Sequence, residues 1–236
     1  MTAVLERWDT SGDRRAEFLH RWAKVTDSVL RGVRNGRFRD GQWILRLLEQ
    51  TNDYYFITVE PEGDDLHLVT PAAWHAAHDA AKDRIAPLTS VLLGFNAVIN
   101  NDLPQATADV LRDEWPLTMV PLERRYQDFR IAASIIGAAV PEAEGTLTAW
   151  LDDVWVQALM LVTAADAAWC DAIREDIEES AARRAHLLCC DIDGRDVLLS
   201  APADRLARLF PPHHEGASCR VSRELPIWAR AEPMVS

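Results

Sequence analysis

The chain has 236 residues, of which 48% are hydrophobic and 26% are charged, which is the balance of an ordinary globular protein that can bury a large core. Its formal net charge of -12 argues against binding to nucleic acid or to an anionic membrane surface, because both partners need a basic face. No run of about 18 apolar residues occurs, so no membrane span is expected, and the N-terminus lacks the apolar region of a secretory signal.

The four cysteines contain no C-x-x-C pair, so a zinc knuckle is not indicated. Reduced cysteines in a cytoplasmic protein are the simplest account. The nine tryptophans are many for this length. Most of them should lie in the core, but flat and rigid rings also suit a pocket for an apolar or aromatic ligand.

In chain order, residues 1–12 are expected to form a flexible arm. Apolar residues then recur at helical spacing, which predicts a helix that ends near Gly36; they are Phe18, Trp22, Val25, Val29 and Val33. Asp40 can cap a second helix that runs into the aromatic stretch 53–57, which could end this helix or begin a short strand. Residues 61–65 are expected to form a turn, and residues 66–69 an extended segment.

A helix that begins at Thr70 and Pro71 carries Trp74, His75 and His78. The two histidines lie three residues apart and could together hold a metal. No carboxylate or further ligand stands at a defined spacing from them, however. We therefore interpret them as surface histidines, and a metal-dependent hydrolase is the third of three functional hypotheses.

Residues 91–104 place amides and a carboxylate in an otherwise apolar helix, which should therefore be buried. One seam of this helix holds Thr89, Leu93, Asn96, Asn100 and Leu103. A buried amide without a partner costs about 1–3 kcal/mol, so Asn96 and Asn100 should both be paired. Either they bond to neighbouring helix ends, with residues 101–104 as the helix exit, or they line a cavity and face a ligand.

The second half of the chain shows further helical stripes. A short helix is expected over residues 104–114, and a longer one over 121–140 in which Arg125 could point inward. A heptad seam over 147–168 predicts a second buried helix that packs along the first. A charged helix over 175–186 and a last helix over 200–210 follow.

These patterns together predict an all-α fold. We expect a single-domain bundle, residues 13–210, of roughly seven to nine helices with two buried central helices. The arm 1–12 and an irregular tail, 211–236, flank it. No Gly-rich phosphate loop, G-x-S-x-G or H-E-x-x-H motif occurs, which weakens nucleotide-dependent and serine-hydrolase interpretations.

Five blocks of the sequence carry a family resemblance: residues 13–19, 36–43, 54–56, 71–74 and 92–103. The chain resembles a bacterial family of uncharacterised helical proteins, a domain-of-unknown-function family common in actinobacteria, over roughly residues 10–140. The family signature is Asn-Ala-His-Ile-Asn-x-Asp-Leu, and Val98 replaces its histidine here. The resemblance implies no particular activity, and any activity that depends on that histidine is in doubt.

Our leading hypothesis is a small-molecule enzyme of specialised metabolism that uses no organic cofactor and no metal. It would carry out a cyclisation, an isomerisation or a hydrolysis in an apolar pocket that binds an apolar or aromatic ligand. The candidate catalytic residues are Asn96, Asn100, Asp102 and Asp128. The candidate substrate-binding residues are Trp43, Tyr55, Trp74, Arg125 and Tyr126. The alternative is a non-catalytic ligand- or partner-binding protein with structural amides and no cavity beside Asn100.

Overall fold

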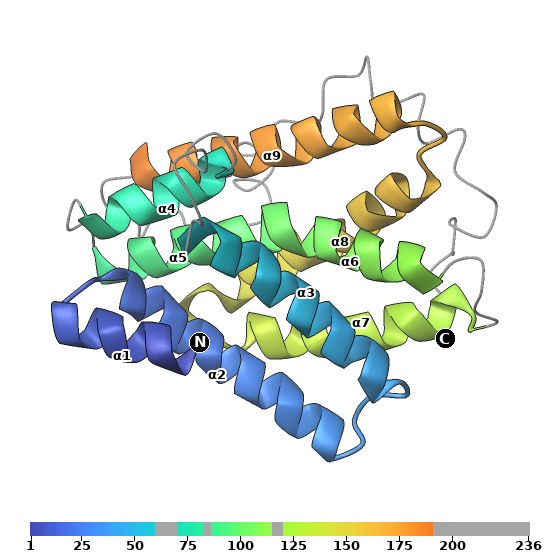
Figure 1. Ribbon diagram of the computed structural model, residues 1–236, viewed down its shortest axis with the longest axis horizontal. Helices are drawn as coiled ribbons and strands as arrows, with labels where there is room; N and C mark the ends of the chain where they lie inside the picture. The colour runs from blue at the N-terminus through green and yellow to red at the C-terminus, as the bar shows by residue number, and fades with distance from the viewer. Residues whose placement is uncertain (60–69, 83–85, 115–119, 191–236) are drawn as a thin grey trace. The chain divides into compact units, whose positions relative to one another are not determined.

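The computed structural model describes residues 1–59, 70–82, 86–114 and 120–190 (Figure 1). In these ranges the chain forms nine α-helices, a π-helical turn and a short 3-10 turn, and no strand. They belong to one compact unit, Met1–Leu198. The prediction of an all-α bundle is therefore confirmed. The turn expected at 61–65, the extended segment 66–69, the helix 200–210 and the tail 211–236 lie outside the described residues.

The N-terminal segment is helical, so the prediction of a flexible arm is wrong. Residues Thr2–Ser11 form α1, which buries Val4 and Trp8 and ends at Gly12 in the left-handed conformation, with φ of 69°. The guanidinium carbon of Arg15, at the start of α2 (Arg15–Arg34), lies 4.4 Å from the centre of the Trp8 ring. Two buried residues one turn apart thus hold this helix on the core.

The next two helices begin where their caps predict. The side chain of Asp40 accepts a hydrogen bond from the backbone N–H of Trp43 at 3.0 Å and opens α3 (Gly41–Val59). The aromatic stretch 53–57 continues α3 rather than starting a strand. Helix α4 (Ala72–Lys82) follows Pro71.

The centre of the bundle is one continuous helical run. Helix α5 (Pro87–Ala97) passes through the π-helical turn η2 (Val98–Asp102) directly into α6 (Leu103–Glu114). The interpretation of residues 101–104 as a helix exit is therefore wrong. Pro104 has no N–H to donate to a carbonyl one turn earlier, and the widened π turn falls at that place in the run. Figure 1 shows this run in green between α4 and α9 on one side and α1 and α2 on the other.

Three helices complete the unit: α7 (Leu122–Gly137), α8 (Glu144–Thr163) and α9 (Ala167–Cys190). Helix α8 packs on α6 and η2, as expected for a second buried helix. The seam predicted to reach residue 168 instead stops at Ala164, whose ψ of 125° leaves the helix, so Ala165 and Ala168 are exposed. Helix α9 packs on α4 and α5.

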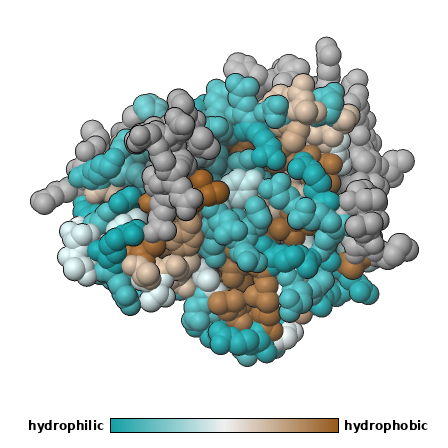
Figure 2. All heavy atoms as spheres, in the orientation of Figure 1, coloured by the Kyte–Doolittle hydropathy of each residue, from teal (hydrophilic) through white to brown (hydrophobic). Residues whose placement is uncertain are grey.

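The surface in Figure 2 is mainly hydrophilic, with separate hydrophobic areas. The large hydrophobic side chains exposed in the described ranges are Ile57 and Val156. None of the helices described here combines the length and the apolar character that a membrane span needs.

Candidate functional site

The π turn places a carboxyl group in the middle of the protein. Asp102 is 1% exposed and accepts the indole N–H of Trp74 at 2.9 Å and 3.1 Å and the amide N–H of Asn101 at 2.8 Å. No cation pairs with it in the described part of the chain. Burial raises the pKa of Asp102 to about 7, against the two hydrogen bonds that lower it. This carboxyl group therefore changes its charge near neutral pH.

His78 lies on the face of the same tryptophan. Its ring centre is 5.5 Å from that of Trp74, and the two planes are nearly parallel, at 22°. Burial, and then the charges of Arg15, Lys82 and His75, lower the pKa of His78 to about 4. The imidazole is therefore neutral at neutral pH. The interpretation as a surface histidine holds for the exposed His75, whereas His78 is half-buried and stacks on Trp74.

A small cavity opens in front of these two rings. Its volume is about 10 Å³, which is room for about one water molecule. Three aromatic side chains wall it, with ring-centre distances of 4.9 to 5.7 Å: Phe18, Tyr55 and Trp74. The other lining residues are Arg15, Ala77, His78, Ala81, Ser90 and Gly94.

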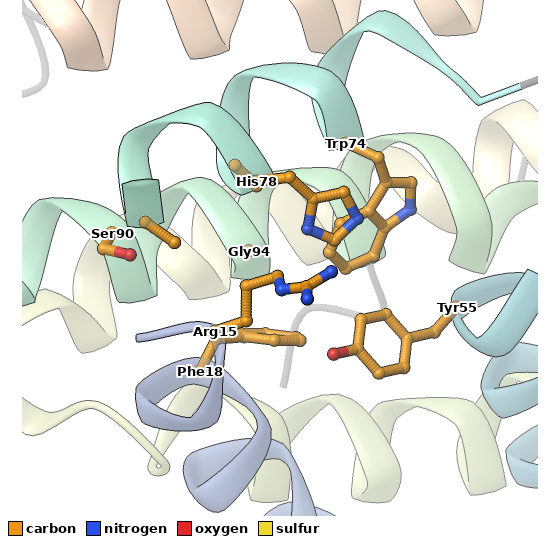
Figure 3. A pocket seen from close by; sticks show the side chains of 9 residues that line it. Arg15, Phe18, Tyr55, Trp74, His78, Ser90 and Gly94 are labelled. Carbon is orange, nitrogen blue, oxygen red and sulfur yellow. The ribbon is translucent and has the colours of Figure 1, made fainter. Parts of the chain in front are cut away.

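Three polar groups from three helices converge on this cavity (Figure 3). They are the Arg15 guanidinium of α2, the Tyr55 hydroxyl of α3 and the His78 imidazole of α4. Burial raises the pKa of Tyr55 well above its usual value, so its hydroxyl stays protonated. We call this arrangement the Arg15–Tyr55–His78 pocket.

Arg15 is held at the pocket wall by Asp13. Arg15 Nε lies 3.0 Å from Asp13 Oδ2 and 3.1 Å from Oδ1, and a terminal nitrogen lies 2.6 Å from Oδ2. Burial acts to raise the pKa of Asp13, but the side-chain and backbone hydrogen bonds from Arg15 outweigh it and lower that pKa. The two groups are therefore an ion pair at neutral pH, in a fixed, forked geometry.

Gly94 determines how closely the pocket walls approach. A Cβ atom added at this position would overlap the ring of Phe18. The glycine therefore allows α2 to approach α5 closely enough for Phe18 to reach the aromatic wall.

The predicted amide pair faces α9 instead of this pocket. Asn96 donates to the backbone carbonyl of Ala181 at 2.9 Å, and Asn100 donates to the Asn96 side chain at 3.0 Å. Arg184 donates in turn to the Asn100 side-chain oxygen. Both amides are buried, as is Val98 at the position of the signature histidine. Their hydrogen bonds join the central run to α9.

Asp128, Arg125 and Trp43 lie together at the start of α3. The Asp128 carboxylate accepts the backbone N–H groups of Arg39 and Asp40, each at 2.8 Å. Arg125 is buried, pairs with Asp40 at 2.6 Å and lies 5.3 Å from the centre of the Trp43 ring. Burial acts to raise the pKa of Asp40, but the hydrogen bonds from Arg125 and Trp43 lower it.

The structure thus brings three of the predicted residues, Tyr55, Trp74 and Asp102, to one place and separates the others from it. Tyr126 lines a different cavity, between α7 and α8. The sequence reasoning missed Arg15 and His78 as pocket residues. A signal for His78 was present, because it follows Trp74 by four residues and such a pair meets on one helix face. In the described ranges no three His, Cys, Asp or Glu side chains come together as metal ligands.

A family model matches most of the chain. The model of a family described as "Family of unknown function (DUF5995)" matches residues 1–187. No match was found among curated proteins or among solved structures. The match extends beyond the expected range of 10–140 and includes most of α9. The chain belongs to this DUF5995 family, whose function is unknown.

Proposed function

We propose that the protein is a small-molecule enzyme that works without an organic cofactor and catalyses a hydrolysis in the Arg15–Tyr55–His78 pocket. The observation that carries the proposal is a water-sized cavity beside a neutral imidazole, a guanidinium and a phenol, inside an aromatic wall. Among the three reactions expected from the sequence, hydrolysis is the one that uses a single water as reactant. A pocket with few convergent polar groups and perturbed pKa values is typical of an active site.

His78 is the general base in this proposal. Its neutral imidazole accepts a proton from the water as that water attacks a carbonyl carbon. The imidazolium formed has a pKa of about 4, so it readily passes the proton to the leaving group. Arg15 and Tyr55 supply donors for the oxygen that becomes negative in the transition state.

Asp102 acts through Trp74 and is therefore a positioning residue. Its carboxyl group fixes the edge of the indole ring, and a carboxylate at that edge makes the ring face more negative. His78 lies on that face, where a cation is stabilised by the ring. The carboxylate thereby favours the imidazolium that forms during the reaction.

The pocket favours a small, uncharged substrate. The Asp13–Arg15 ion pair has no net charge, and the walls are aromatic. The cavity itself holds about one water molecule, so an ester or amide with an apolar or aromatic acyl group would meet the attacking water from the open side of the cavity. We keep in the proposal a role in specialised metabolism and a cytoplasmic location, which the free thiol of Cys170 favours.

A panel of para-nitrophenyl esters, with acetate and phenylacetate as acyl groups, tests the proposal. The variant is His78→Gln, and the matched control is His75→Gln on the exposed face of the same helix. We expect kcat/KM to fall by about 100-fold in the first variant, as for loss of a general base, and to stay unchanged in the second. No turnover by the parent protein, or equal rates in the two variants, would refute the proposal.

A non-catalytic binding protein is the second candidate. The amides Asn96 and Asn100 favour it, because both are hydrogen-bonded to protein groups and so act as packing contacts between helices. In that case the protein would hydrolyse none of the esters, whether or not it binds them.

A further inference from the structure

A second cavity, of about 120 Å³, lies between α7 and α8. It is lined by Tyr126, Phe129, Arg130, Ala133, Ser134, Thr148, Leu151 and Asp152. None of these residues lines the Arg15–Tyr55–His78 pocket. We call this space the α7–α8 cavity.

The packing of the two helices explains why this space exists. At one end they approach closely, since a Cβ added at Gly137 would lie 3.0 Å from Thr148 Oγ1. At the other end Trp155 packs on Tyr126 and on Phe129, with ring-centre distances of 5.3 Å for both pairs. Between these two contacts α7 presents the short side chains Ala133 and Ser134, which leave the space unfilled.

The cavity has an apolar floor and a charged rim. Phe129 and Leu151 are each 3% exposed and form the floor. Arg130 and Asp152 are exposed at the rim, and neither forms an ion pair within the described residues. The Arg130 guanidinium lies 6.0 Å from the centre of the Tyr126 ring. The rim therefore offers one cation and one anion above an apolar surface.

The size of the cavity limits the apolar part of a ligand to one ring. Its volume of about 120 Å³ is close to that of an apolar cavity of about 150 Å³ that accepts benzene. A ring stacked in such a space gains most of its binding free energy from burial, and charged groups at the rim give orientation.

We propose that the α7–α8 cavity is a binding site for a small aromatic zwitterion of the free aromatic amino acid class. The ring occupies the floor formed by Phe129 and Leu151. The carboxylate of the ligand meets Arg130, and its ammonium group meets Asp152. This site goes beyond the hydrolytic pocket and does not depend on its activity.

Isothermal titration calorimetry of the full chain with L-phenylalanine tests this site. We expect Arg130→Gln and Asp152→Asn each to weaken binding by about tenfold, the loss that one charged hydrogen bond gives. The controls are Arg124→Gln on α7 and Asp171→Asn on α9, both exposed charges outside the cavity. The controls should bind like the parent.

Two truncated probes separate the charge contacts. Phenethylamine lacks the carboxylate, so it should bind the parent and Arg130→Gln with equal affinity. Phenylpropionate lacks the ammonium group, so it should bind the parent and Asp152→Asn with equal affinity. Ala133→Leu fills the cavity and should abolish binding, with its melting temperature showing that it folds. Absence of phenylalanine binding at millimolar concentration, or equal binding by the parent and both rim variants, would overturn the proposal.

Discussion

Trp74 donates its indole N–H to both oxygens of Asp102, at 2.9 Å and 3.1 Å, and each residue is 1% exposed. This contact joins α4 to the π turn η2 and places a carboxyl group directly behind the wall of the Arg15–Tyr55–His78 pocket. A buried carboxylate with neutral donors and no cationic partner is destabilising. Such a group is retained more often for function than for stability.

Asp102 should make the folded protein less stable as the pH rises. Its pKa is raised from 3.8 to about 7, so the folded state binds the proton more tightly than the unfolded chain. The contribution of this group to the free energy of unfolding is highest below about pH 4. It falls as the pH rises to about 7, by a total on the order of 4 kcal/mol. Asp102→Asn should remove this decrease and be more stable than the parent at neutral pH.

Urea denaturation of Asp102→Asn and of the parent, at several pH values, measures the difference between them. Subtracting one curve of unfolding free energy against pH from the other cancels the contributions of the other titrating groups. If the difference is the same at pH 5 and at pH 8, the buried carboxyl group does not titrate in this range.

His78 should have the opposite effect, at lower pH. Its pKa is lowered from 6.5 to about 4, so the unfolded chain binds the proton more tightly than the folded state. The free energy of unfolding should therefore fall by about 3 kcal/mol as the pH drops through this range. His78→Gln should abolish that decrease, and His75→Gln should leave it in place. Chemical denaturation at about pH 4.5 and pH 6.5 distinguishes the two variants.

Gly94→Ala should destabilise the protein although alanine favours helix. The added Cβ overlaps the ring of the buried Phe18, and such overpacking costs about 1–3 kcal/mol. Gly145→Ala is the control, because a Cβ there meets nothing within 4 Å, and it should gain up to about 1 kcal/mol. Thermal melts of both variants give the comparison. Equal stability of the two would show that α2 and α5 are not in close contact.

Asn100→Leu should be strongly destabilising because Arg184 would lose a buried acceptor. The expected loss is about 2–4 kcal/mol, the range for breaking a buried contact to a charge. Adding Arg184→Met should restore about half of that loss, because the double variant no longer buries the charge. If Arg184→Met destabilises the Asn100→Leu variant by as much as it destabilises the parent, the two side chains do not interact.

The strongest helices could be predicted from the sequence alone. The apolar stripes of α2, α7 and α8 repeat over four or more turns, which gives a clear period. Helix α1 was missed because its stripe consists of only Val4 and Trp8. The continuous run through η2 was missed because Pro104 normally marks a boundary, and a π turn has no sequence signal of its own.

The candidate site could be predicted only in part. The sequence indicated Tyr55, Trp74 and Asp102 from their residue types in apolar surroundings. It could not indicate that Asn100 is paired with Arg184, because those residues are 84 positions apart and only the fold brings them together. For the same reason the role of Asp128 in fixing the start of α3, through Arg39 and Asp40, was not predictable.

The pH dependence of kcat/KM for para-nitrophenyl acetate tests the proposed role of His78 most directly. Measured from about pH 3 to pH 8, the rate of the parent should rise through an apparent pKa of about 4, because the unprotonated His78 is the base. The same rise should be absent from His78→Gln and present in His75→Gln. A profile that lacks the rise near pH 4, or one unchanged by His78→Gln, would contradict the account.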